Sequence, residues 1–340
     1  MSGALILHRT GPQVTVQDKG RAGYQAQGLS RGGAVDRLAL DEAAALLGAP
    51  GAALEMAGLG GSFEVTRPAR IALTGAPMQA TRDGEALAWH AVHALAPGQR
   101  LEIGACRSGS YGYLSLGGGI ATPEVLGARS AHLVAGIGAV LSAGADVPLG
   151  ADAGGAVDAV LPVEDRFSGG TLRVVAGPQT ARFAEVMERF EATAFTRDPR
   201  ANRQGVRMTP PGGAGFATEG ALQVVSEVIA PGDIQVTGDG APYVLLAECQ
   251  TTGGYPRIGT VIPADLPRAA QAPAGAEVRF RMVTLDEALA AERARRDHAA
   301  GLAARVRPLL RDPARMGDLL AHSLISGVTA GDPEAEEHWP

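Results

Sequence analysis

The chain has 340 residues, of which 46% are hydrophobic and 19% are charged, and this ordinary globular composition excludes general disorder. Because a single domain usually holds about 100 to 200 residues, the length predicts two lobes with separate hydrophobic cores. The net charge of −6 argues against a nucleic-acid surface, and no run of about eighteen apolar residues is present to span a membrane.

The first predicted lobe covers residues 1–165 and reads as mainly β. Short β-rich runs at 5–7 and 14–16 precede a glycine-rich loop at 20–33. Asp36 is a candidate N-cap for a helix that ends before Gly48. Residues 62–116 are then predicted to form a meander of strands, with Asp83-Gly84 as a two-residue hairpin turn.

Residues 143–170 are small, glycine-rich and acidic, and we interpret them as the bridge to a second lobe at 166–285. In that lobe Phe183, Val186, Met187 and Phe190 follow helical spacing and predict a helix with these four side chains in the core. Further strands are expected at 172–175, 222–229, 234–236, 243–247 and 278–283. A capping-box pattern at Thr284 and Glu287 begins a helical tail at 286–340.

Three residue types limit the chemistry. Lys19 is the only lysine, so neither a P-loop nor a biotin-carrier segment is present in this sequence. Cys106 and Cys249 are too few for a disulfide framework, which favours a reducing, cytoplasmic location. His90 and His93 fall in a strand-like stretch that directs them to opposite faces, so we expect no metal site there.

Residues 28–32 (GLSRG) match the pattern of a nucleophile elbow, with Ser30 at its centre. No clear strand precedes this segment, and the later histidines lie in no triad context. We therefore interpret it as a loop whose glycines allow a sharp turn or the close approach of a ligand.

A different polar segment, 248–256 (ECQTTGGYP), follows an apolar strand and places hydrogen-bonding side chains around two glycines. It could bind an amide or a carboxylate, or it could be a turn whose hydroxyls satisfy its own backbone. Arg21, Arg129, Arg203 and Arg207 lie in or beside glycine-rich turns. Arginine there suits bidentate recognition of carboxylate or phosphate, although each could equally form a structural ion pair.

Several of these segments together resemble the allophanate hydrolase subunit 2 family, over residues 5 to about 285. The resemblance is carried by 16–24 (VQDKGRAGY), 28–36 (GLSRGGAVD), 54–55 (LE), 117–120 (GGGI), 126–130 (LGARS), 177–179 (GPQ), 202–207 (NRQGVR) and 250–256 (QTTGGYP). It implies a fold of two cyclophilin-like β-barrel lobes, followed here by the helical tail.

The family includes the C subunit of bacterial 5-oxoprolinase, an antagonist of a sporulation kinase inhibitor, and half of the carboxyltransferase domain of urea carboxylase. For a chain of this length the resemblance implies ATP-dependent opening of 5-oxo-L-proline to L-glutamate, performed together with the A and B subunits of 5-oxoprolinase. ATP would be shared with those subunits. The alternatives are a biotin-dependent carboxyltransferase or urea amidolyase-related protein, and a non-catalytic regulatory partner of a homologue of the B subunit.

From this resemblance we expect one polar cleft, in which Arg129, Arg203 and Arg207 neutralise phosphate charge and hold the substrate carboxylate. The catalytic candidates are Asp18 and Glu55 as acid or base, with Arg203. The expected substrate-binding residues are Arg21, Ser30, Arg129, Ser130, Asn202, Arg207, Gln250, Thr251, Thr252, Gly253, Gly254 and Tyr255.

Overall fold

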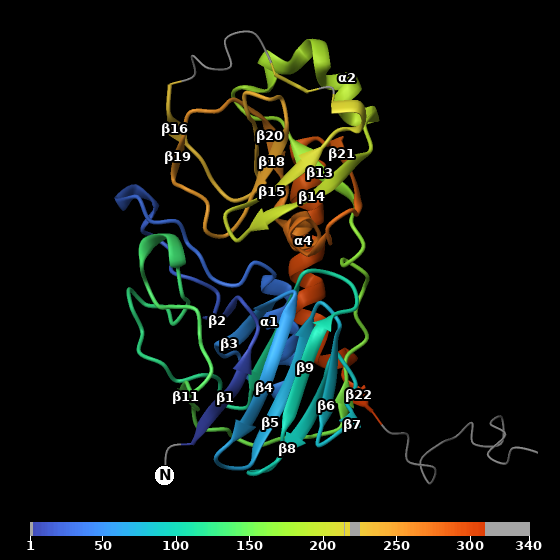
Figure 1. The fold of residues 1–340 in the computed structure, drawn as a ribbon. Coiled ribbons are helices and arrows are strands. Elements are labelled where there is room, and N and C mark those ends of the chain that lie inside the picture. The colour runs from blue at the N-terminus through green and yellow to red at the C-terminus, as the bar shows by residue number, and fades with distance from the viewer. Residues whose placement is uncertain (1–2, 214, 218–224, 310–340) are drawn as a thin grey trace, which may run out of the picture.

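A computed structural model describes residues 3–213, 215–217 and 225–309, and the fold is mainly β, as predicted. Within these residues the strands form two large sheets, one closed barrel and a two-stranded arm. Figure 1 shows the barrel at one end, the two large sheets at the other, and helix α4 at their junction.

The two large sheets come from the first half of the chain, except for one short strand at residues 307–308. One has the order β11-β1-β4-β9-β6-β7, and the other has the order β2-β3-β10-β5-β8-β12-β22. Their bounds are β1 Ala4–Thr10, β2 Val14–Gln17, β3 Ala53–Ala57, β4 Leu59–Val65, β5 Ala69–Gly75, β6 Met78–Arg82, β7 Glu85–Ala86, β8 Ala91–Leu95, β9 Leu101–Cys106, β10 Tyr111–Leu116, β11 Asp146–Pro148, β12 Ala159–Val160 and β22 Arg307–Pro308.

The barrel closes in the order β13-β20-β17-β18-β15-β14-β21, with β21 returning parallel to β13. These strands are β13 Gly170–Val175, β14 Phe195–Asn202, β15 Gly205–Thr209, β17 Asp233–Val236, β18 Pro242–Leu245, β20 Arg257–Val261 and β21 Glu277–Met282; β16 Glu227–Val228 and β19 Thr252–Gly253 form the arm. The strand expected at 222–229 is represented only by β16, and residues 222–224 lie outside the described residues.

The helices are α1 Arg37–Leu47, α2 Ala184–Ala192, α3 Leu266–Gln271 and α4 Leu285–Gly301. Asp36 caps α1 by accepting a hydrogen bond from the Ala39 amide, and Thr284 with Glu287 forms the predicted capping box of α4. Phe183 and Phe190 are fully buried, and Val186 and Met187 pack against the same core, so the predicted core face of that helix is confirmed. A four-ring phenylalanine cluster around Phe190 fills the barrel.

The segment interpreted as a bridge contributes a strand to each of the two large sheets. β11 pairs with β1, and β12 pairs with both β8 and β22. The chain after α4 thereby returns to the sheets of the first half. Among the described residues, no helix is long and apolar enough to cross a membrane.

The two neighbouring histidines, His90 and His93, have different surroundings. His93 lies within β8, whereas His90 precedes the strand with a φ of 55°. The His90 Nε2 atom lies 3.0 Å from the Gly75 carbonyl oxygen, and the ring stacks on Phe167. Burial, with the charge of Arg166 added, lowers the pKa of His90 to about 4.

Acidification is therefore expected to destabilise the protein through His90. Because its pKa is lower in the folded state, the unfolded state binds the proton more tightly, and stability present above about pH 6.5 is lost as the pH falls towards 4. The lowered pKa of His90 corresponds to a decrease of about 3 kcal/mol in the free energy of unfolding. Urea unfolding at pH 7 and at pH 4 measures this decrease. His90→Asn, which tolerates the left-handed backbone, should show a smaller pH dependence than the unmodified chain, and equal dependence would contradict the assignment.

Candidate functional site

A pocket of about 530 Å³ opens on the barrel and combines amide, hydroxyl and aromatic groups. It is formed by the turn between β14 and β15, by β17 and β18, and by the loop before β20. Its lining residues are Arg200, Ala201, Asn202, Gln204, Gly205, Gln235, Thr237, Tyr243, Leu245 and Tyr255. A concave surface with apolar walls and a few polar groups is the usual form of a small-molecule site.

Gln235 is the most informative of these residues. It lies on β17 between Ile234 and Val236, and only 7% of its surface is exposed. Its Nε2 atom is buried and has no hydrogen-bond partner among the described residues. An unsatisfied buried donor costs about 1–3 kcal/mol. Because Gln235 lines the pocket, a rotation of its amide would present this donor to a ligand acceptor.

Gly253 allows the Gln235 amide to occupy that position. A Cβ atom at Gly253 would lie 2.4 Å from Gln235 Nε2. Tyr255, two residues further along the same loop, lines the pocket and is 44% exposed. The predicted loop 250–256 therefore contributes to the pocket through its second half.

The first half of that loop is placed differently. Gln250 and Thr252 are exposed, and Thr251 is buried with its carbonyl accepting from the Ile229 amide at 3.0 Å. Thr252 and Gly253 form β19, which pairs with β16. Thr251 and Thr252 therefore help to hold the two-stranded arm through their backbone groups.

Alternation along the β14–β15 turn separates the predicted residues Asn202 and Arg203. Asn202 and Gln204 are exposed and line the pocket, whereas Arg203 between them is 4% exposed and points to the interior. Asn202 Oδ1 also accepts from the Gln204 amide at 2.8 Å, which stiffens the turn.

Arg203 connects the barrel to the first half of the chain. Its Nε donates to Glu248 at 2.7 Å, its Nη1 donates to Glu55, and its Nη2 donates to the Gly33 carbonyl at 2.7 Å. Burial alone would lower the pKa of Arg203, but the charges of Glu55 and Glu248 raise it above its ordinary value. Glu55 also accepts from Tyr113 and from the Val35 amide. Each nitrogen of the Arg203 guanidinium donates within the protein, and both carboxylate oxygens of Glu55 accept there.

Asp18 organises a separate loop cluster. One carboxylate oxygen accepts from the Gly20 amide and the Ser130 hydroxyl, and the other accepts from the Arg129 amide at 2.7 Å. Arg21 is 1% exposed and donates to the Ser130 carbonyl at 2.5 Å. Arg129 forms an ion pair with Glu124 at 3.1 Å. Asp18 and Arg129 line a cavity of about 280 Å³ that does not include Arg203.

Arg207 has a third set of partners. It pairs with Asp198 at 2.9 Å and with Asp239 at 2.6 Å, and it lies 6.0 Å from the centre of the Tyr243 ring, at the edge of the barrel pocket. The structure therefore does not bring Arg129, Arg203 and Arg207 into one cleft. Each guanidinium pairs with a different set of carboxylates, a selection that the sequence does not encode locally.

Ser30 lies closer to a histidine than the sequence suggested. Its Oγ is 2.9 Å from His132 Nε2, and both residues are buried. His132 Nδ1 accepts from the Ala135 amide at 3.3 Å, so in the neutral ring the proton lies on Nε2, which donates to Ser30. Burial lowers the pKa of His132 and favours that neutral form. A histidine in this tautomer cannot take the serine proton, which agrees with a loop rather than a nucleophile elbow.

Gly254 lies in the exposed part of the loop before Tyr255. Sequence reasoning did not identify Gln235, Thr237, Tyr243 or Arg200 as site residues. The sequence contained one signal for Gln235, namely a glutamine inside the apolar strand 234–236. Among the described residues, no group of three or more His, Cys, Asp or Glu side chains is arranged to hold a metal ion.

Known proteins match most of the chain. The family described as "Carboxyltransferase domain, subdomain A and B" matches residues 27–282. The chain is 34% identical over 302 residues to the C subunit of 5-oxoprolinase from Escherichia coli, covering 84% of this chain and 94% of that protein. It is 30% identical over 285 residues to the same-named protein of Haemophilus influenzae, covering 81% and 90% respectively.

Solved structures share the fold. TTHA0988 superposes with a TM-score of 0.74 at 30% identity, over 82% of this chain and 56% of that chain. The urea amidolyase of Kluyveromyces lactis superposes with a TM-score of 0.77 at 23% identity, over 91% of this chain and 21% of that chain. This chain therefore spans about half of TTHA0988 and about one fifth of the amidolyase.

Proposed function

This chain belongs to the family of carboxyltransferase subdomains A and B, and from that premise we propose that it is the C subunit of a multi-subunit 5-oxoprolinase. In this proposal it acts with the A and B subunits in the cytoplasm to open 5-oxo-L-proline to L-glutamate at the expense of ATP. The observation that carries it is the 34% identity to the C subunit of a 5-oxoprolinase over 94% of that protein's length.

The barrel pocket supports this assignment chemically. A lactam nitrogen donates electron density into its carbonyl, so water attacks the ring slowly. Transfer of the ATP phosphoryl group to the lactam oxygen, with release of ADP, removes that obstacle. Water then adds, the ring C–N bond breaks with a proton to nitrogen, and hydrolysis of the resulting γ-glutamyl phosphate releases phosphate. Gln235 Nε2 would donate to a substrate oxygen, with Asn202 and Tyr255 positioning the ring.

The nucleotide is assigned to a partner protein in this proposal. The single lysine, Lys19, forms an ion pair with Asp41 at 2.6 Å and lies outside any P-loop sequence. Asp18, Glu55 and Arg203, which the sequence offered as catalytic candidates, have positioning roles in this proposal, because they hold the glycine-rich loop, β3 and loop 248–256 in register.

A second candidate function is that of a biotin-dependent carboxyltransferase. It is favoured by the matched family and by 26% identity over 306 residues to a putative urea carboxylase of Emericella nidulans. In that case the same pocket would receive carboxybiotin from a separate carrier protein.

Reconstitution distinguishes these candidates. Glutamate and ADP are measured after mixing 5-oxoproline and ATP with the A and B subunits, with and without this chain. The proposal predicts glutamate formation only when this chain is present. Activity of the A and B subunits alone, or consumption of carboxybiotin without glutamate formation, would overturn it. Retained binding to the B subunit with no activity would instead favour a regulatory partner.

Gly253→Ala tests how the pocket is built. The new methyl group would displace the Gln235 amide, and because that contact is the end of a flexible side chain, the folded state should lose less than about 1 kcal/mol. Loss of one ligand hydrogen bond should raise KM for 5-oxoproline by about tenfold. Steady-state kinetics of the assembled complex measure this, and Gly254→Ala in the neighbouring position is the control. An unchanged KM would mean that the amide does not contact substrate.

A further inference from the structure

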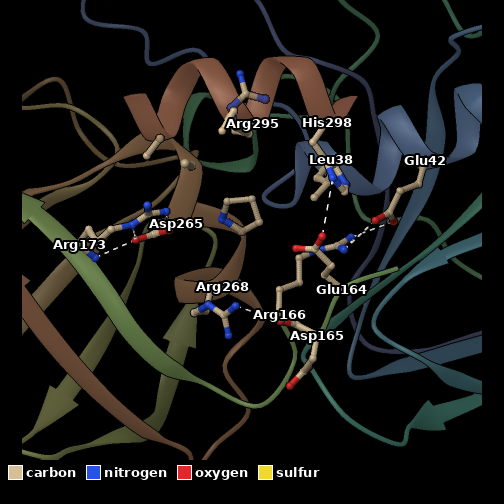
Figure 2. A pocket seen from close by; sticks show the side chains of 14 residues that line it. Leu38, Glu42, Glu164, Asp165, Arg166, Arg173, Asp265, Arg268, Arg295 and His298 are labelled. Carbon is tan, nitrogen blue, oxygen red and sulfur yellow. Dashed lines mark hydrogen bonds and ion pairs between the residues drawn. The ribbon is translucent and has the colours of Figure 1, made fainter. Parts of the chain in front are cut away.

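Helix α4 lies across the junction of the two halves (Figure 1). It borders two adjoining cavities that share Pro267 and Arg295, of which Figure 2 shows the larger. The larger cavity holds about 350 Å³ and is lined by four arginines and four acidic residues, some of which pair with one another. Figure 2 shows Arg166 directed at Glu42 and Arg173 at Asp265, with distances of 2.7 and 2.6 Å. Because its acidic side chains equal its arginines in number, the larger cavity has no net charge that would attract a charged ligand.

The smaller cavity differs in its balance of charge. It holds about 140 Å³ and draws its walls from the first half of the chain, from the barrel and from α4. Apolar side chains such as Val35, Leu246 and Leu266 form most of the wall. Arg37 and Arg295 supply the charge, and none of the described residues that line this cavity is acidic.

Arg37 has unfilled hydrogen-bonding capacity. Its Nη2 donates to the Gly32 carbonyl at 3.1 Å, while its buried Nε has no partner among the described residues. Burial, with the charges of Arg31 and Arg295 acting in the same direction, lowers the pKa of Arg37 to about 10. Arg295 is held by Glu292 through two bonds of 2.8 Å. The Arg37 guanidinium is therefore a half-buried cation beside other cations.

We propose that this cavity is a second ligand site, which binds a small aliphatic carboxylate. The carboxylate would lie between Arg37 and Arg295, and the aliphatic chain would lie against Val35, Leu246 and Leu266. The volume suits a chain of a few carbons and excludes a nucleotide. This inference concerns a site separate from the barrel pocket and does not depend on the proposed reaction.

One backbone segment separates the two sites. Leu245 lines the barrel pocket, and the next residue, Leu246, lines the smaller cavity. The neighbouring Ala247 carbonyl accepts from the Gly32 amide at 3.0 Å, so the glycine-rich loop is attached to the same segment. A carboxylate in the cavity would contact all three parts of the molecule and stabilise their arrangement.

The test uses the full chain with butyrate as the probe, and follows binding by thermal unfolding and titration calorimetry. Butyramide supplies the same shape without charge, and inorganic phosphate supplies charge without the aliphatic part. Arg295→Gln is compared with Arg296→Gln, because both remove a bond to Glu292 but only Arg295 lines the cavity. Arg37→Gln is the third variant.

Butyrate should raise the melting temperature of the unmodified chain and of Arg296→Gln. Its affinity should fall at least about tenfold in Arg295→Gln and Arg37→Gln, and Gln235→Leu should bind it normally. An equal shift with butyramide, an equal shift with phosphate, or full binding by Arg295→Gln would each overturn the proposal. If Arg37→Gln does not fold, the pair Arg295→Gln and Arg296→Gln still decides the result.

Discussion

Replacing Arg203 with methionine is expected to lower the free energy of unfolding by about 3–5 kcal/mol. The substitution leaves the carboxylates of Glu55 and Glu248, each 2% exposed, without their shared cation. It also removes the donor to the Gly33 carbonyl that joins the barrel to the glycine-rich loop. Urea unfolding measured at pH 7 gives the change directly.

The matched control is Arg281→Met. Arg281 forms an exposed ion pair with Glu287 at 3.7 Å, so its loss should change stability by less than about 0.5 kcal/mol. Adding Glu55→Gln and Glu248→Gln to Arg203→Met should recover part of the lost stability, because the unpaired charges are removed. An Arg203→Met protein as stable as the Arg281→Met control would show that the ion-pair network does not join the two halves.

Gln235→Leu is expected to lower the activity of the complex without lowering the free energy of unfolding of the chain. Removing a buried donor that has no partner among the described residues should leave the free energy of unfolding unchanged or raise it by about 1 kcal/mol. If that donor contacts the substrate during the reaction, kcat/KM for 5-oxoproline in the assembled complex should fall roughly 100-fold. Urea unfolding of the chain and initial rates of glutamate formation provide the two values.

Gln271→Leu is the comparison for stability. Gln271 is fully buried, donates to Asp36 and to the Tyr111 carbonyl, and accepts from the Ser110 and Tyr111 amides. The same substitution there should cost more than about 2 kcal/mol, because several buried groups lose their partners. If Gln235→Leu were destabilised to the same degree, Gln235 would be a structural residue and not a ligand donor.

Local signals in the sequence predicted several elements correctly. Asp36 as a cap predicted the start of α1, Thr284 with Glu287 predicted α4, and Asp83-Gly84 forms the hairpin turn between β6 and β7. Each signal acts within a few residues, where backbone geometry and side-chain hydrogen bonding fix the outcome. Strand β14 gave no such signal. It contains charged residues and Pro199, and it is held by pairing with β15 and β21.

The site was predictable in part. Asn202 and Tyr255, which were predicted from the sequence, line the barrel pocket, and Gly253 packs beside the Gln235 amide. The partners of Arg203 could not be predicted, because Glu55 lies 148 residues away in the sequence. Closure of the barrel and packing between the two halves bring these residues together. Sequence spacing carries no information about that arrangement.

Binding of 5-oxoproline to the assembled complex, measured by titration calorimetry without ATP, tests the barrel pocket most directly. The unmodified complex should bind the lactam, and the complex that carries Gln235→Leu should bind it at least about tenfold more weakly. Equal dissociation constants for the two complexes would contradict the claim that this pocket holds the substrate.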